Sequence, residues 1–166
     1  MFARFGAGIL IAVLLAAVCM PSAGLITSGP QSFVYPVMGP RLSSKFGFRE
    51  HPVLNVKKHH HGVDLAAPDG AVIRSISSGR VVFADSYGSY GKLIVVEHEN
   101  GMTSHYGHCE SIKVGPGKAV KAGQIIGTVG HTGRVTGAHL HFEIRKNGEP
   151  QNPEQFLPNL QIQAQG

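Results

Sequence analysis

The sequence predicts an all-β fold: one small domain built as a sheet of antiparallel strands. Three observations lead to this prediction. After residue 35, short apolar runs alternate with glycine-containing turns at roughly ten-residue spacing. No segment of that region keeps the 3.6-residue apolar period of an amphipathic helix. The chain also has 22 glycines among its 166 residues, which suits many tight turns.

The N-terminal residues 1–23 resemble a secretory signal. Arg4 precedes the apolar run 9–20, and small residues follow it. An uncleaved anchor is the alternative, and we expect membrane contact only through this segment. The chain is thus predicted to be exported to the periplasm or to the extracellular cell-wall space. The other predicted boundaries are a linker at 24–34, a folded domain at 35–157 and a flexible tail at 158–166.

Strands are expected wherever apolar runs lie between turn signals. The turns include Pro68-Asp69-Gly70 and Gly115-Pro116-Gly117. Asn100-Gly101 lies between two such runs and predicts a tight β-hairpin. The expected strands are 71–76, 79–84, 92–97, 102–106, 111–114, 124–129 and 139–145.

Charge and cysteine content narrow the class of protein. The formal net charge of +5 suits an anionic partner such as a cell-wall polymer, although it could serve solubility alone. No block of lysine and arginine is interleaved with aromatic residues, so nucleic acid is not an expected partner. Cys19 lies in the predicted signal and leaves only Cys109, so no disulfide within the mature chain is expected, and a monomer is predicted.

The C-terminal strand carries a His-x-His pair. His139, His141, Glu143 and Arg145 alternate with apolar residues, so these four polar side chains share one face of the strand. The two imidazoles lie about 7 Å apart at Cα, a spacing at which one can bind a metal while the other reaches the water on that metal. A pair of ordinary half-buried histidines is the alternative.

A second cluster, His59-His60-His61 followed by Asp64, makes a metal more plausible. His60 and Asp64 in a straight strand would lie about 13 Å apart at Cα, so the segment must bend. Gly62 permits the bend, which places His60 on a loop and Asp64 at the start of a strand. His59 and His61 remain rival ligands, and a loosely metal-binding histidine tract is the alternative. Two imidazoles and one carboxylate form the open ligand set of a catalytic zinc site.

His108 is a further candidate, because hydrolysis needs a group that takes a proton from water and passes it to the leaving amine. His139 is equally suited, and the sequence does not rank the two. Cys109 follows His108 directly and could suggest a thiol–imidazole dyad. Adjacent strand residues face opposite sides, so we expect Cys109 in the core as a small apolar residue and His108 on the site face.

These motifs, in this order, resemble the lysostaphin/LytM-type zinc endopeptidases of cell-wall turnover. The resemblance extends from about Pro40 to Pro153. Two departures, Cys109 where leucine is usual and Ala138 where proline is common, leave the metal set untouched. The matching segments are 43–49, 60–68, 79–82, 90–91, 106–108, 123–127 and 132–144.

The resemblance implies a role for each matching position. His60, Asp64 and His141 fall where the ligands of one zinc ion per chain lie, and His108 and His139 fall where two non-ligating catalytic histidines lie. It implies a groove-bearing antiparallel β domain at 35–157. It also implies hydrolysis, by a metal-activated water, of peptide cross-links or stem peptides in bacterial peptidoglycan.

Two other functions compete with this interpretation. A non-catalytic regulator of other wall hydrolases could keep the fold, but such a protein would be expected to lack ligands, and here all five positions are filled. A metal-storage or metal-delivery protein could use the histidine tract. Such a protein would bind several ions loosely, whereas an enzyme would bind one zinc tightly.

Overall fold

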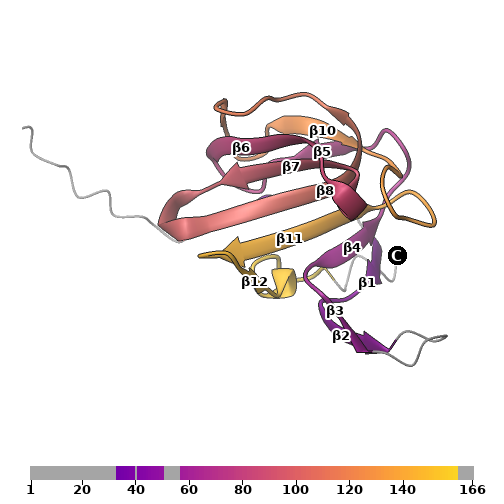
Figure 1. Ribbon diagram of the computed structural model, residues 1–166. Coiled ribbons are helices and arrows are strands. Elements are labelled where there is room, and N and C mark those ends of the chain that lie inside the picture. The colour runs from indigo at the N-terminus through magenta and orange to yellow at the C-terminus, as the bar shows by residue number, and fades with distance from the viewer. Residues whose placement is uncertain (1–32, 40, 51–56, 161–166) are drawn as a thin grey trace, which may run out of the picture.

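The computed structural model describes residues 33–39, 41–50 and 57–160, and regular structure there is almost entirely β-strand (Figure 1). The helical turns within these ranges are three-residue 3-10 segments, Gly88–Tyr90, Glu99–Gly101 and Pro153–Gln155. Among the described residues, no helix has the length and apolar content needed to cross a membrane. The predicted signal at 1–23 lies outside the described residues.

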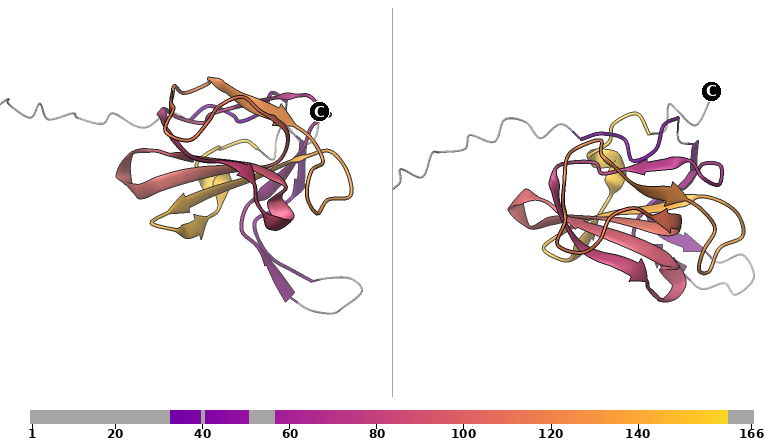
Figure 2. Two further views of the ribbon diagram at one scale, coloured as in Figure 1. Left: turned by 45° about the horizontal axis from the view of Figure 1, so that its top comes forward. Right: turned by 90° about the horizontal axis from the view of Figure 1, so that it is seen from above.

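A ten-stranded sheet forms the domain, and neighbouring strands pair antiparallel, as the sequence predicted. Two further strands, β2 and β3, pair in a separate ribbon that stands away from the rest (Figures 1 and 2). Along the main sheet the order is β1 (Arg41–Ser44), β4 (Val63–Ala66), β11 (Leu140–Lys146), β8 (Met102–Ile112), β7 (Lys92–Glu97), β6 (Gly79–Ser86) and β9 (Ala119–Val120). The remaining strands are β2 (Gly47–Glu50), β3 (Lys57–His60), β5 (Val72–Arg74), β10 (Ile125–Val129) and β12 (Glu149–Gln151).

The core lies against one face of the central strands. On β11, Leu140, Phe142 and Ile144 are fully buried in it, while the alternate residues point to the opposite face. Strand β10 pairs with both β5 and β8, so the sheet curls over (Figure 2). Ile73 and Ile126 thereby join the same core. Each buried aliphatic or aromatic side chain stabilises the fold by about 1.5–3 kcal/mol. The opposite face of β11 is thereby left for polar side chains.

The hairpin between β7 and β8 has the turn that the sequence predicted. Asn100 and Gly101 both have positive φ, at 61° and 68°, a conformation that asparagine and glycine adopt more readily than other residues. Strand β8 then runs unbroken from Met102 to Ile112, whereas the sequence suggested two strands. The expected break is a bulge, where Gly107 and His108 together face Leu93.

The segment that enters the site differs from expectation in two ways. His60 ends strand β3 rather than lying on a loop, because it pairs with Gly47 of β2. The chain does bend at Gly62, but φ is not positive there. Glycine is needed because a Cβ atom would lie 2.2 Å from the carbonyl oxygen of Phe142. The bend therefore depends on close packing of β4 against β11.

The packed core extends slightly beyond the predicted domain limits. Phe33 contacts Phe156, with ring centroids 5.8 Å apart, so the end of the predicted linker packs on the domain. Leu160 is buried as well, although the sequence assigned it to the tail. Residues 161–166 lie outside the described residues.

Candidate metal centre

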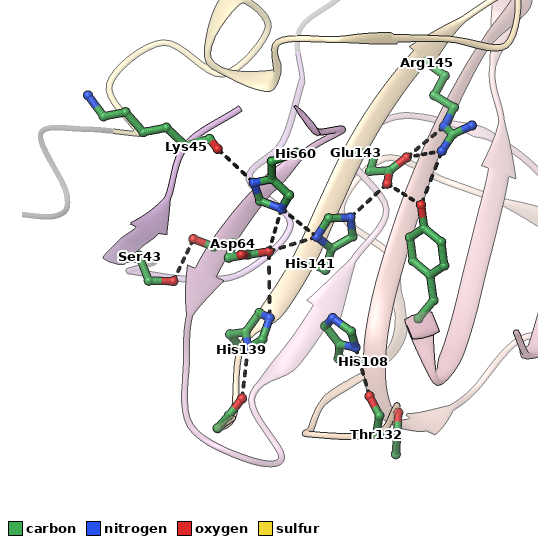
Figure 3. Close-up of polar contacts among 12 residues, drawn as sticks. Ser43, Lys45, His60, Asp64, His108, Thr132, His139, His141, Glu143 and Arg145 are labelled. Carbon is green, nitrogen blue, oxygen red and sulfur yellow. Dashed lines mark hydrogen bonds and ion pairs between the residues drawn. The ribbon is translucent and has the colours of Figure 1, made fainter. Parts of the chain in front are cut away.

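Three side chains that the sequence singled out meet at the junction of β3, β4 and β11. Asp64 on β4 and His141 on β11 are direct partners across the two strands, so their side chains leave the sheet on the same face. His60 reaches them from the end of β3, because the chain turns back at Gly62. Figure 3 shows all three pointing toward a common point.

The distances between the three side chains fit one metal ion. His141 Nδ1 lies 2.8 Å from Asp64 Oδ1, and His60 Nε2 lies 3.1 Å from each of those atoms. Zinc held by nitrogen and oxygen at about 2.0–2.2 Å in a tetrahedron separates its ligands by about 3.3 Å. Among the described residues, these three form the cluster of ligand side chains suited to a metal. These three side chains could hold a tetrahedral ion and would leave its fourth position to a water molecule.

Each ligand imidazole is oriented by a hydrogen bond at the ring nitrogen that faces away from the centre. His60 Nδ1 lies 2.8 Å from the carbonyl oxygen of Lys45, which can only accept, so Nδ1 carries the proton and Nε2 offers its lone pair to the centre. His141 is turned the other way. Its Nε2 lies 2.9 Å from Glu143 Oε1, so Nε2 donates and Nδ1 faces the centre.

His108 and His139, the two predicted catalytic residues, lie beside the ligands (Figure 3). Their ring centroids are 4.8 Å apart, and His108 is 5.8 Å from the ring of His141. His108 Nδ1 donates to the carbonyl of Thr132 at 2.9 Å, and His139 Nδ1 donates to that of Gly137 at 2.9 Å. Both histidines therefore keep Nε2 free to accept a proton.

The electrostatics of the site follow from burial and from these contacts. Burial by itself would raise the pKa of Asp64, but hydrogen bonds from His141 and His60 outweigh it and hold that pKa well below its usual value. Burial also lowers the pKa of His108 to about 4, so its imidazole is neutral at pH 7. The centre thus combines an ionised carboxylate with at least one neutral base.

His108 has an unusual backbone conformation. Its φ is +62°, in the left-handed region that costs a residue with a side chain about 1–2 kcal/mol. The bulge at Gly107 and His108 lets His108 face the centre while Cys109 is fully buried. Burial raises the pKa of the Cys109 thiol to about 12, so it is a poor nucleophile. The core placement expected for Cys109 is confirmed, although a bulge rather than simple alternation produces it.

The neighbouring histidines of the tract have other contacts. His59 packs edge-on against Phe46 and Phe48, with centroid distances of 5.0 Å and 4.8 Å. His61 is exposed and lies 5.2 Å from the ring of His59. Neither belongs to the metal cluster, which contains His60 alone of the three.

The polar group behind His141 was not assigned a role from sequence. Glu143 is completely buried, and its Oε1 accepts from Tyr90 at 2.6 Å while its Oε2 accepts from Arg145 Nε at 2.8 Å. The period of two along β11 places Glu143 and Arg145 on the site face, so the alternation was the available signal. Tyr90 lies in the 3-10 turn before β7; it belongs to the matching segment 90–91, but the sequence assigned it no role.

Comparisons with known proteins identify the family to which the chain belongs. The model of the family described as peptidase family M23 matches residues 58–153. A DD-carboxypeptidase/endopeptidase of Neisseria meningitidis, named Mpg, is 42% identical over 120 residues. That alignment covers 72% of this chain but 28% of the relative, so the chain spans less than a third of that protein's length.

Solved structures show the same fold. A zinc-containing peptidase from Vibrio cholerae superposes with a TM-score of 0.68 at 38% identity, over 74% of this chain and 39% of that one. The catalytic domain of lysostaphin from Staphylococcus simulans superposes with a TM-score of 0.64 at 32% identity. This second alignment covers 71% of this chain and 92% of that domain, so the fold corresponds to a whole catalytic domain.

Proposed function

Because the chain belongs to peptidase family M23, we propose that it is a zinc-dependent endopeptidase acting on bacterial peptidoglycan. Its substrates would be the peptide cross-links or stem peptides of the wall. One observation carries the proposal: an open three-ligand centre at His60, Asp64 and His141 lies beside two histidines whose Nε2 atoms are free. This combination supports metal-assisted hydrolysis over binding alone.

The three ligand side chains fit zinc, since two imidazoles and one carboxylate are ligands that zinc prefers. Bound there, zinc would polarise the scissile carbonyl and make a water acidic enough to lose a proton near neutral pH. His60 and His141 are each oriented by an acceptor behind the ring, so the centre is arranged before any metal arrives.

We propose different tasks for the two remaining histidines. His139 Nε2 lies 3.8 Å from Asp64 Oδ1, so the nitrogen that can accept a proton lies next to the ligand cluster. His139 is therefore our candidate for the general base, which would return the proton to the leaving amine. His108 is held neutral by burial and would orient the attacking water by accepting a hydrogen bond at Nε2.

The proposed substrate also bears on location. A chain acting on peptidoglycan would work in the periplasm or the cell-wall space, and residues 1–23 would direct its export. The net charge of +5 would favour association with an anionic wall polymer.

The test compares His141→Ala with His59→Ala, because both remove an imidazole from the same neighbourhood. Zinc would be measured by atomic emission, and wall fragments released from purified peptidoglycan would be measured by mass spectrometry. The parent and His59→Ala should each hold one zinc per chain and release peptide fragments, whereas His141→Ala should do neither. The fragment masses would also identify the bond that is cut.

Other outcomes would point to the rival functions. Full zinc occupancy in His141→Ala would contradict the ligand assignment. A parent protein that binds one zinc but releases no fragment would support a regulator of other hydrolases. Several weakly bound ions per chain would support metal storage.

A further inference from the structure

The geometry points to Glu143 as a positioning residue that orients His141 so that Nδ1 faces the metal. This inference rests on the proposed zinc centre and adds a residue to it. Glu143 is not one of the three ligand side chains and would act through the imidazole of His141, which it contacts at 2.9 Å.

Four histidines surround the centre, and His141 differs from the other three in the ring nitrogen that it presents to the centre. His60, His108 and His139 each donate from Nδ1 to a backbone carbonyl and present Nε2. His141 presents Nδ1, so its Nε2 needs an acceptor on the far side of the ring. That acceptor is the carboxylate of Glu143, and it is the one acceptor of the four that belongs to a side chain.

Glu143 is itself held in one place. Its Oε1 accepts from His141 and Tyr90, and its Oε2 accepts from Nε of Arg145 at 2.8 Å and from Nη2 at 2.6 Å. A fully buried carboxylate is costly unless it is paired and fully hydrogen-bonded, and these four contacts meet that condition. Figure 3 shows the chain of contacts from Asp64 through His141 and Glu143 to Arg145.

The position of Glu143 also depends on the bend between the other two ligands. A Cβ atom at Gly62 would lie 2.8 Å from Glu143 Cγ and 2.2 Å from the backbone oxygen of Phe142. The turn that joins His60 to Asp64 thus packs directly on Glu143. The side chain of Glu143 therefore packs against the turn through its Cγ and contacts the ring of His141 through its carboxylate.

Two consequences follow for metal binding. The hydrogen bond to Glu143 keeps the proton on Nε2, which leaves the lone pair on Nδ1, where the ligand cluster requires it. The negative acceptor also makes the imidazole a stronger donor of its lone pair. Loss of such a partner typically lowers metal affinity by about 10–100-fold.

The experiment uses Glu143→Gln in the full chain, because glutamine keeps the shape of the side chain but removes its charge. Zinc affinity would be measured by competition with a chromophoric chelator. We expect zinc binding about 10–100-fold weaker than in the parent. Tyr90→Phe is the matched control, since it removes one donor to Glu143 but leaves the contact with His141; its zinc affinity should stay within about threefold of the parent.

A second measurement separates positioning from general structural damage. Long-range nitrogen–proton NMR of the metal-free protein, at alkaline pH where imidazoles are neutral, reports which nitrogen of His141 carries the proton. The parent should show the proton on Nε2, and Glu143→Gln should show a mixture of both forms. If that variant does not fold, Glu143→Met combined with Arg145→Met removes carboxylate and guanidinium together, so no buried charge is left unpaired. This double variant should show the same two changes, namely weaker zinc binding and a mixture of the two proton positions on His141.

A folded Glu143→Gln protein with parental zinc affinity and an unchanged His141 proton would overturn the inference. Neither readout requires peptide cleavage. If the parent binds zinc but cleaves no wall fragment, the proposed activity fails while the role of Glu143 is still decided. If the parent binds no zinc at all, the zinc centre fails, and the NMR measurement alone decides whether Glu143 orients His141.

Discussion

The left-handed backbone at His108 leads to a prediction that reverses the usual order of two substitutions. In strands, glycine is normally less stable than alanine by about 0.5–1 kcal/mol, because it loses more backbone freedom on folding. At φ = +62° alanine carries a steric cost of about 1–2 kcal/mol that glycine does not. His108→Gly should therefore be more stable than His108→Ala, by about 0.5–1 kcal/mol after the two effects are subtracted.

The comparison isolates the backbone, because both substitutions remove the same ring and the same hydrogen bond to Thr132. His105 provides the matched control pair: it lies on the same strand, three residues away, and its φ is not positive. There the order should be the ordinary one, with His105→Ala more stable than His105→Gly.

The assay is urea unfolding of the four variants in the presence of a chelator, so that metal affinity does not enter the free energy of unfolding. The difference in the free energy of unfolding between the alanine and glycine variants should itself differ by about 1–2 kcal/mol between positions 108 and 105. If His108→Ala has a higher free energy of unfolding than His108→Gly, by the same margin as His105→Ala over His105→Gly, the strain argument is wrong. Both His108 variants should also lose roughly 100-fold or more in kcat, because each lacks the imidazole proposed to orient water.

Three further predictions follow from the site and its surroundings. His139→Ala should keep its zinc but lose roughly 100-fold in kcat with little change in KM, checked by metal analysis beside steady-state kinetics. His61→Ala should keep zinc while His60→Ala loses it, and the reverse result would reassign the ligand. Burial lowers the pKa of His105 to about 4 against 6.5 in the unfolded chain, so the unfolded chain takes up its proton first as pH falls. Stability should then fall from about pH 6.5 to about pH 4 by up to about 3 kcal/mol, and His105→Gln should flatten that part of the curve in urea titrations.

The parts of the fold that could be predicted are those with strong local signals. Strand β7 matches its predicted bounds, and the Asn100-Gly101 turn is where the sequence placed it. Strands β1, β2 and β3 were missed, because four-residue strands with mixed polarity carry little periodicity. The break expected between 106 and 111 was a bulge, which depends on the partner strand and is not visible in one segment alone.

For the site, side-chain chemistry was easier to predict than geometry. The spacing to Asp64 and the alternation around His141 predicted a shared cluster, and the structure places His60, Asp64 and His141 together. The sequence did not distinguish His59, His60 and His61 from one another without the resemblance, because the choice depends on how β3 meets β4. It also gave no reason for Gly62 beyond flexibility, since the close approach of Phe142 arises from contact between distant segments.

The backbone acceptors behind three of the histidines have a consequence for mutational scanning. Lys45, Thr132 and Gly137 contribute carbonyl oxygens, which every amino acid possesses, so substitution there leaves the acceptor chemically intact. A scan of single substitutions would therefore underestimate how much of the centre depends on these loops. Insertions and deletions of one residue would reveal it, because they move the carbonyl itself. Tolerance to substitution combined with intolerance to changes in length should be the genetic signature of Lys45 and Gly137. Thr132 should tolerate substitution less well, because its hydroxyl also accepts from the Lys92 N–H and donates to the Cys109 carbonyl.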